Sequence, residues 1–125
     1  MVVANDFPGF LHWMPGAENF LVFEQNAEAS KQAIAEAECI MMLDFNNLSR
    51  GGVLHNEIGK TRSPRILVDH HRDPDLSQFY CAYSTTGVSS ASEIVTEIIL
   101  HYGKELITES IATNLLVGIM TDTGS

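Results

Sequence analysis

Two histidines and an aspartate follow an apolar run near the middle of the chain, in the stretch ILVDHHRDPD at residues 66–75. A neutral imidazole nitrogen is a good metal ligand, and a neighbouring carboxylate commonly fixes which ring nitrogen carries the proton. Two further aspartates follow apolar segments: Asp44 comes after CIMML, and Asp122 lies in the final TDTGS. Oxygen and nitrogen donors without thiolates suit manganese or magnesium better than structural zinc. These residue types therefore predict a divalent metal site, if the fold brings them together.

The elements that must position these residues alternate between short apolar runs and amphipathic segments. The apolar runs predict strands at residues 20–23, 39–43, 65–68 and 79–83. The amphipathic segments predict helices at residues 27–37, 53–61 and 91–102 and from 109 onward, with Asn26, Ser90 and Thr108 as N-caps. Ser90 and Glu93 should form a reciprocal capping box. This alternation is typical of an α/β fold, a Rossmann-like parallel sheet with right-handed crossovers and flanking helices.

Ligands of open parallel sheets bind beyond the carboxyl ends of the strands. Asp44 and the Asp69-His70-His71 stretch both occupy that position, so we expect them to face one crevice. Because adjacent residues of an extended chain point in opposite directions, His70 and His71 should have different tasks, one on metal and one on substrate. Asp122 is expected in a turn after a helix that packs on the sheet. The continuous run at 39–43 indicates a strand covered on both faces.

Length and composition indicate a single globular domain. The chain has 125 residues, of which 45% are hydrophobic and 18% charged. No apolar run approaches the roughly 20 residues that cross a bilayer, and the first residues do not resemble a signal peptide, so we expect a cytoplasmic protein. Cys39 and Cys81 lack a metal-binding spacing and are predicted to be reduced core residues. Trp13 could stack on a nucleobase, but burial in the core is the stronger expectation.

A net charge of −9 argues against broad non-specific binding to nucleic acid. Five of the seven cations nevertheless lie between residues 50 and 72: Arg50, Lys60, Arg62, Arg65 and Arg72. They form either a solvated face or a local funnel for anions near the histidines. The metal site has ordinary alternatives as well, since a His-His pair is often a surface feature and an aspartate after a strand is often a turn former.

The ordered stretches CIMMLDFNNLSR, ILVDHHRDP and GIMTDTGS resemble the second, third and fourth motifs of the DHH phosphoesterase superfamily. The opening VVANDFPGFLHWMPG and the later SSASEIV look like its nano-RNase and pAp-phosphatase branch. The resemblance implies a two-metal hydrolase, usually manganese-dependent and with Mg²⁺ as a substitute, acting on short oligonucleotides or 3′,5′-bisphosphonucleotides (pAp). It also implies roles for individual residues. Asp44, His70 and Asp122 would be metal ligands, Asp69 would orient the histidines, and His71 would contact the scissile phosphate or assist the leaving group.

Two parts of the family pattern have no counterpart in residues 1–125. The first motif, a His followed by Asp-x-Asp, should lie upstream, and the substrate-binding domain should lie downstream. We therefore expect a partial DHH domain with weak metal binding, negligible turnover and an unpaired sheet edge that favours self-association. Two other functions stay open: a non-catalytic nucleotide- or anion-binding module that uses the helix beginning near Ser90, and an acidic interaction domain with a degenerate site.

Overall fold

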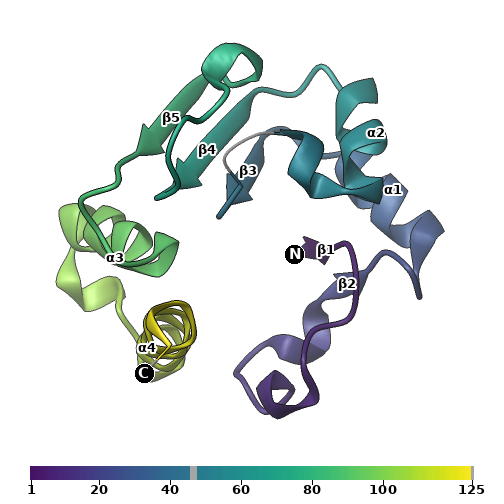
Figure 1. Ribbon diagram of the computed structural model, residues 1–125. Coiled ribbons are helices and arrows are strands. Elements are labelled where there is room, and N and C mark those ends of the chain that lie inside the picture. Colours follow the sequence, from purple (N-terminus) through teal and green to yellow (C-terminus); the bar gives the residue numbers. More distant parts are fainter. Residues whose placement is uncertain (46–47, 125) are drawn as a thin grey trace.

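The structure is a computed structural model that describes residues 1–45 and 48–124. Its helices are α1 (Ala27–Ala35), α2 (Val53–Lys60), α3 (Ala91–Tyr102) and α4 (Glu109–Thr123). Its strands are β1 (Val2–Val3), β2 (Leu21–Val22), β3 (Ile40–Leu43), β4 (Arg65–Asp69) and β5 (Cys81–Ser84). In Figure 1, α1 and α2 lie to the right of the three-stranded sheet formed by β3, β4 and β5, and α3 and α4 lie to its lower left. The predicted α/β class with parallel strands and flanking helices is confirmed.

The strands form two sheets rather than the single predicted one. β1 pairs with β2 in parallel, and a three-stranded parallel sheet has the order β3-β4-β5. Among the described residues, β2 therefore pairs with β1 and not with the next strand along the chain. In Figure 1, β3 is the strand of its sheet nearest to the β1–β2 pair. The other edge of β3 has no partner strand in the described part of the chain.

The core lies between the first two helices and the three-stranded sheet. It is a cluster of buried side chains from α1, β3, α2 and β4: Ile34, Met42, Leu54, Ile58 and Leu67. Burial of each such side chain stabilises the fold by about 1.5–3 kcal/mol. On its other face β4 contacts α3, so the strand that is covered on both faces is β4.

Three expectations of burial are wrong. Met41 on β3 is 56% exposed, so this strand is covered on one face only. Cys39 and Cys81 are both exposed thiols rather than core residues. Trp13 is 64% exposed and does not enter the core. Each error has the same cause. An apolar residue is buried only where another element packs over it, and the order of the elements along the chain does not determine which element that is.

The ends of the helices are formed by side chains close to the predicted ones. The Ser90 hydroxyl accepts the Glu93 N–H at 3.1 Å, and the Thr108 hydroxyl accepts the Ile111 N–H at 3.3 Å. The Glu93 carboxylate, however, accepts the N–H and the hydroxyl of Ser89, at 3.0 and 2.9 Å. The reciprocal capping box is therefore displaced by one residue. Asn26 precedes α1 without a side-chain hydrogen bond to it.

Helix α4 packs mainly on α3 and not, as predicted, on the sheet. A Cβ atom at Gly118 would lie 2.0 Å from the Ser92 hydroxyl oxygen, so the glycine allows this close approach. Asp122 lies in the last turn of α4 rather than in a turn after it. No helix in the described ranges combines the length and the apolar character that crossing a membrane requires.

Candidate active site

Asp44 follows β3 directly and has a left-handed backbone, with φ 67°. Its N–H still donates to the Val68 carbonyl at 2.9 Å, so the sheet ladder continues through this residue. A left-handed non-glycine residue costs on the order of 1–3 kcal/mol and persists where the surroundings impose it, commonly at functional sites. The conformation turns the chain at the carboxyl end of β3, where the sequence predicts a ligand.

Asp69 ends β4 and is completely buried. One carboxylate oxygen accepts the backbone N–H of His71 at 3.1 Å, and the other lies 2.7 Å from His71 Nδ1. Because a carboxylate accepts hydrogen bonds, this contact places a proton on Nδ1. The buried acid therefore fixes the ring of His71 and directs its Nε2 atom away from Asp69.

His70 lies between two carboxylates that come from distant parts of the chain. Its Nε2 atom is 3.0 Å from Asp122 Oδ2 and 3.4 Å from Asp44 Oδ1. The same nitrogen is buried and makes no hydrogen bond of good geometry with the described residues. A buried polar atom without a hydrogen bond is costly unless another group satisfies it.

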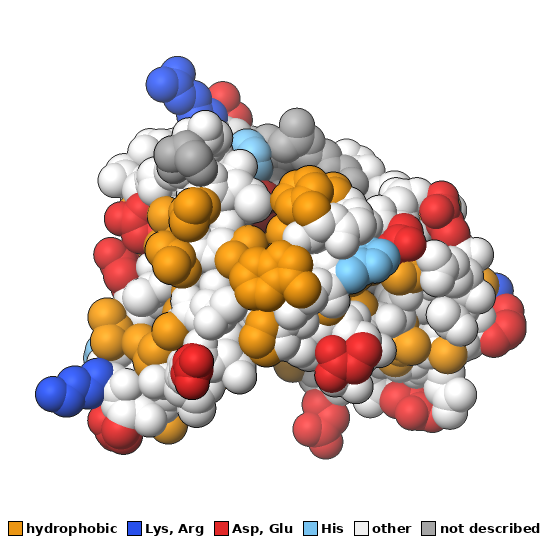
Figure 2. Space-filling model, turned by 90° about the horizontal axis from the view of Figure 1, so that it is seen from below, with side chains coloured by type: hydrophobic (Ala, Val, Ile, Leu, Met, Phe, Trp, Pro, Cys, Tyr) orange, Lys and Arg blue, Asp and Glu red, His pale blue; other side chains and the backbone are white. Residues whose placement is uncertain are grey.

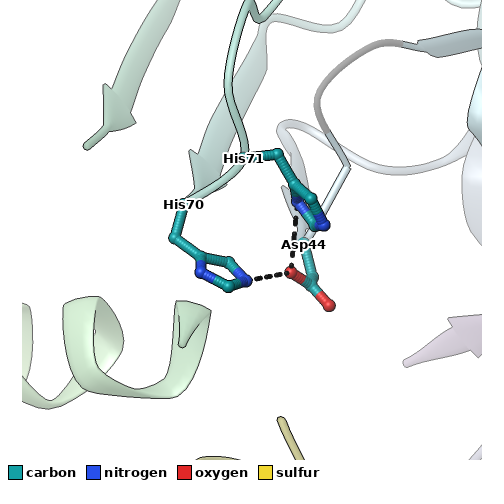
Figure 3. Close-up of side chains that lie close together, drawn as sticks. All are labelled: Asp44, His70 and His71. Carbon is teal, nitrogen blue, oxygen red and sulfur yellow. Dashed lines mark ion pairs between the residues drawn. The ribbon is translucent and has the colours of Figure 1, made fainter. Parts of the chain in front are cut away.

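Figure 3 shows both imidazole rings turned toward Asp44. His71 Nδ1 lies 3.6 Å from Asp44 Oδ1, and the two ring centroids are 4.7 Å apart. The expectation that adjacent histidines point in opposite directions is therefore wrong. It assumes an extended chain, whereas β4 ends at Asp69, just before the pair. The two rings nevertheless have different second partners: Asp122 for His70 and Asp69 for His71.

The donor set fits a divalent cation. Asp44, His70 and His71 each offer a ligand atom, and these atoms all lie within 4.8 Å of one another. His71 Nδ1 is engaged by Asp69, whereas His70 Nε2 faces two carboxylate oxygens and lacks a hydrogen bond. A cation among Asp44, His70 and Asp122 would satisfy that nitrogen and neutralise both acids. The structure brings these three residues together, and their assignment as metal ligands stays a prediction.

A cavity of about 310 Å³ adjoins these carboxylates, between the end of β3 and helices α3 and α4. It is lined by Leu43, Asp44, Ser90, Ala91, Ser92, Val95, Gly118, Thr121 and Asp122. Sequence reasoning does not find Ser92 or Gly118, although a glycine inside an apolar helical pattern is a recognised signal of close packing.

Of the two alternatives for the cations at residues 50–72, the structure does not support an anion funnel beside the histidines for three of them. Lys60 and Arg62 line a different cavity of about 580 Å³, together with Lys31. The Arg65 guanidinium donates to the Ile58 carbonyl at 3.0 Å, near the end of α2. Arg65 begins β4, whereas the histidines follow its other end, about 13 Å away at the usual rise of a strand.

The Arg50 side chain lies outside the described part of the structure, as do Asn46 and Asn47 of the second motif.

Comparisons with known proteins show which family the chain resembles. The model of the DHH family, N-terminal domain, matches residues 4–119, a range that contains Asp44 and His70 but ends before Asp122. No curated protein sequence matches the chain.

Among solved structures, the chain resembles the crystal structure of an exopolyphosphatase-related protein from Bacteroides fragilis. The two are 35% identical, with a TM-score of 0.93, over 98% of this chain and 36% of that one. The chain thus spans little more than a third of that protein. With the family model matched over most of its length and the histidine pair at the end of a buried parallel strand, the chain belongs to the DHH family.

Proposed function

We propose that this chain carries part of the active site of a metal-dependent phosphoesterase that hydrolyses short oligonucleotides or 3′,5′-bisphosphonucleotides (pAp). Its metals are Mn²⁺ or Mg²⁺, in a two-metal mechanism. The observation that best supports this is the buried His70 Nε2 atom, which lies 3.0 Å from Asp122 and 3.4 Å from Asp44 without a hydrogen bond. Family membership supports hydrolase chemistry of the phosphatase type.

In this proposal the side chains of the site have different roles. Asp44, His70 and Asp122 hold the cation, which supplies charge neutralisation at the phosphate and a more acidic bound water. Asp69 acts on the substrate only through His71, whose Nδ1 it holds at 2.7 Å. With that nitrogen occupied, Nε2 is the ring atom of His71 that can reach an oxygen of the phosphoester. When protonated, it can donate that proton to the leaving oxygen.

The number of ligands limits what the chain can do by itself. A pair of octahedral cations requires on the order of ten ligand positions, some of them filled by water. Within the described ranges, the proposed ligand set consists of three side chains, Asp44, His70 and Asp122. We therefore propose weak binding at a single site and slow turnover by the 125-residue chain.

The substrate has a second candidate. The structural neighbour is described as exopolyphosphatase-related, which makes inorganic polyphosphate the alternative for this chain. The free edge of β3 also makes self-association part of the proposal, because unpaired strand edges favour pairing with another chain.

A test that separates an enzyme from a binding module uses a radiolabelled dinucleotide and the purified chain in molar excess. Hydrolysis and equilibrium binding are measured with and without Mn²⁺, for the wild type and for Asp44→Ala and His70→Ala. The proposal requires both signals to depend on Mn²⁺ and to fall at least tenfold in either variant. Asp75→Ala is the matched control, since Asp75 is an exposed acid that bonds only within its own turn.

A non-catalytic module gives the opposite pattern. Dinucleotide binding that is independent of Mn²⁺ and unchanged in Asp44→Ala would contradict the proposed function. Rapid multiple turnover by the 125-residue chain would contradict the proposal of an incomplete ligand set.

A further inference from the structure

The loop between β1 and β2 separates its aromatic residues into an inner and an outer group. Phe7 stacks edge-on with His12 and with Phe20, at centroid distances of 4.7 and 5.3 Å. Phe10 and Trp13, by contrast, are 67% and 64% exposed. The Phe7 contacts help to hold the loop, whereas the rings of Phe10 and Trp13 are accessible to a ligand.

The loop that carries Trp13 has a defined shape. Successive backbone hydrogen bonds join His12 to Gly9 at 3.2 Å and Met14 to Leu11 at 3.0 Å, on either side of the tryptophan. The His12 ring also contacts the Phe7 carbonyl at 3.2 Å. A residue on such a turn has little backbone freedom to lose on binding, which favours affinity.

This loop is attached to the helix that carries one of the site's acids. The Asn114 side-chain amide donates to the Pro15 carbonyl at 3.0 Å, two residues after Trp13. Asp122 lies eight residues after Asn114 on α4, which is about 12 Å along the helix axis. A short oligonucleotide whose phosphate lies at Asp122 and His70 could place a base near this loop.

The charge of the surface determines what it can hold. Lys31 is the first cation of the chain, and α4 contains neither Lys nor Arg. Figure 2 shows hydrophobic side chains in the middle of the face seen from below, with Lys and Arg only at its margins. With a net charge of −9 and no cation on α4 or before Lys31, the protein repels a bare polyanion here, whereas stacking of a neutral base on an aromatic ring needs no positive charge.

We propose that Trp13 is a base-stacking residue that makes the site select nucleotide substrates over inorganic polyphosphate. The inference rests on the proposed phosphoesterase function and names the part of the substrate that Trp13 contacts. Phe10 is a second platform on the same loop. Stacking on an aromatic ring tolerates any base, so selectivity should be for the presence of a base rather than for its identity.

The single tryptophan of the chain provides a direct test by fluorescence. The wild-type chain is titrated with a 5′-phosphorylated dinucleotide and, separately, with tripolyphosphate. Mg²⁺ is used because paramagnetic Mn²⁺ quenches fluorescence by itself. Binding of each ligand is measured independently by calorimetry. The dinucleotide should quench the emission of Trp13, whereas tripolyphosphate should leave it unchanged.

Substitutions extend the test. Trp13→Ala should weaken dinucleotide binding about tenfold, and Trp13→Phe, which retains a ring, should weaken it less. Tyr102→Ala removes another strongly exposed aromatic residue, at the end of α3, and should leave both quenching and affinity unchanged.

Several results would overturn the inference. They are equal quenching by tripolyphosphate, calorimetric binding of the dinucleotide without quenching, and an unchanged affinity in Trp13→Ala. An emission shift that follows protein concentration without ligand would assign the surface to a second copy of the chain instead. Absence of binding by both ligands would contradict the proposed function, and the inference with it.

Discussion

The candidate site has two halves, the histidine pair after β4 and Asp122 on α4, and these two elements differ strongly in burial. The histidine pair follows β4, where Leu67, Val68 and Asp69 are all buried. Asp122 lies on α4, which has no buried residue and packs mainly on α3. The sheet side is therefore held by the core itself, whereas the position of the helix side depends mainly on the contact of α4 with α3. This difference indicates that His70 and His71 are preorganised and that Asp122 is the more adjustable ligand.

Removal of the buried acid should have the largest effect on stability. Asp69→Ala removes a fully buried carboxylate and the acceptor of the His71 N–H and ring, so the free energy of unfolding should fall by about 2–4 kcal/mol. Asp122→Ala, at the other half of the site, should change it by less than about 0.5 kcal/mol. Urea denaturation measures both. Equal losses would show that the two supports do not differ.

A glycine comparison tests the helix contact on which Asp122 depends. Gly118→Ala places a methyl group against Ser92 and should move α4 away from α3. The stability lost by this displacement should cancel the roughly 1 kcal/mol by which alanine stabilises a helix relative to glycine. Gly59→Ala on α2 meets no atom within 4 Å and should keep that gain. Thermal unfolding compares the stabilities, and the NMR shifts of His70 report on its contact with Asp122. A stabilised Gly118→Ala chain with unchanged His70 shifts would refute the role of this contact.

The smallest expected effect concerns the start of α3, which supports α4. Hydrogen bonds from the Ser89 N–H and hydroxyl hold the pKa of Glu93 below its ordinary value. A carboxyl group whose pKa is lowered by folding stabilises the fold at any pH above its pKa in the unfolded state. This stabilisation is lost as the pH falls through its pKa in the folded state. Melting temperatures of wild type and Glu93→Gln should therefore differ at pH 7 and converge in acid, once the pH has fallen below the lowered pKa of Glu93. A difference that persists in acid would indicate a role unrelated to ionisation.

Much of the fold follows from local patterns in the sequence. The runs that became β3 and β4 are short and apolar, and α3 ends at Gly103 as its pattern predicts. Asp44 and His70 were placed correctly at strand ends, because the carboxyl ends of parallel strands share one edge.

The remaining features depend on contacts between distant residues. Both rings approach Asp44 because β4 stops before them and Asp44 adopts φ 67°; the end of the strand was predicted, whereas the backbone angle of Asp44 was not. The exposure of Trp13 depends on which elements cover its loop. Asp122 reaches His70 through the packing of α4 on α3, which the apolar pattern of α4 alone does not specify.

The central claim is that Asp44, His70 and Asp122 hold one divalent cation, and paramagnetic broadening tests it most directly. Substoichiometric Mn²⁺ is added to the ¹⁵N-labelled chain, and EDTA is then added to reverse the effect. Amide signals of residues around these three side chains should broaden first, and Asp44→Ala should abolish the effect. Broadening spread over exposed acids such as Glu28 and Glu36, or unchanged in Asp44→Ala, would contradict it.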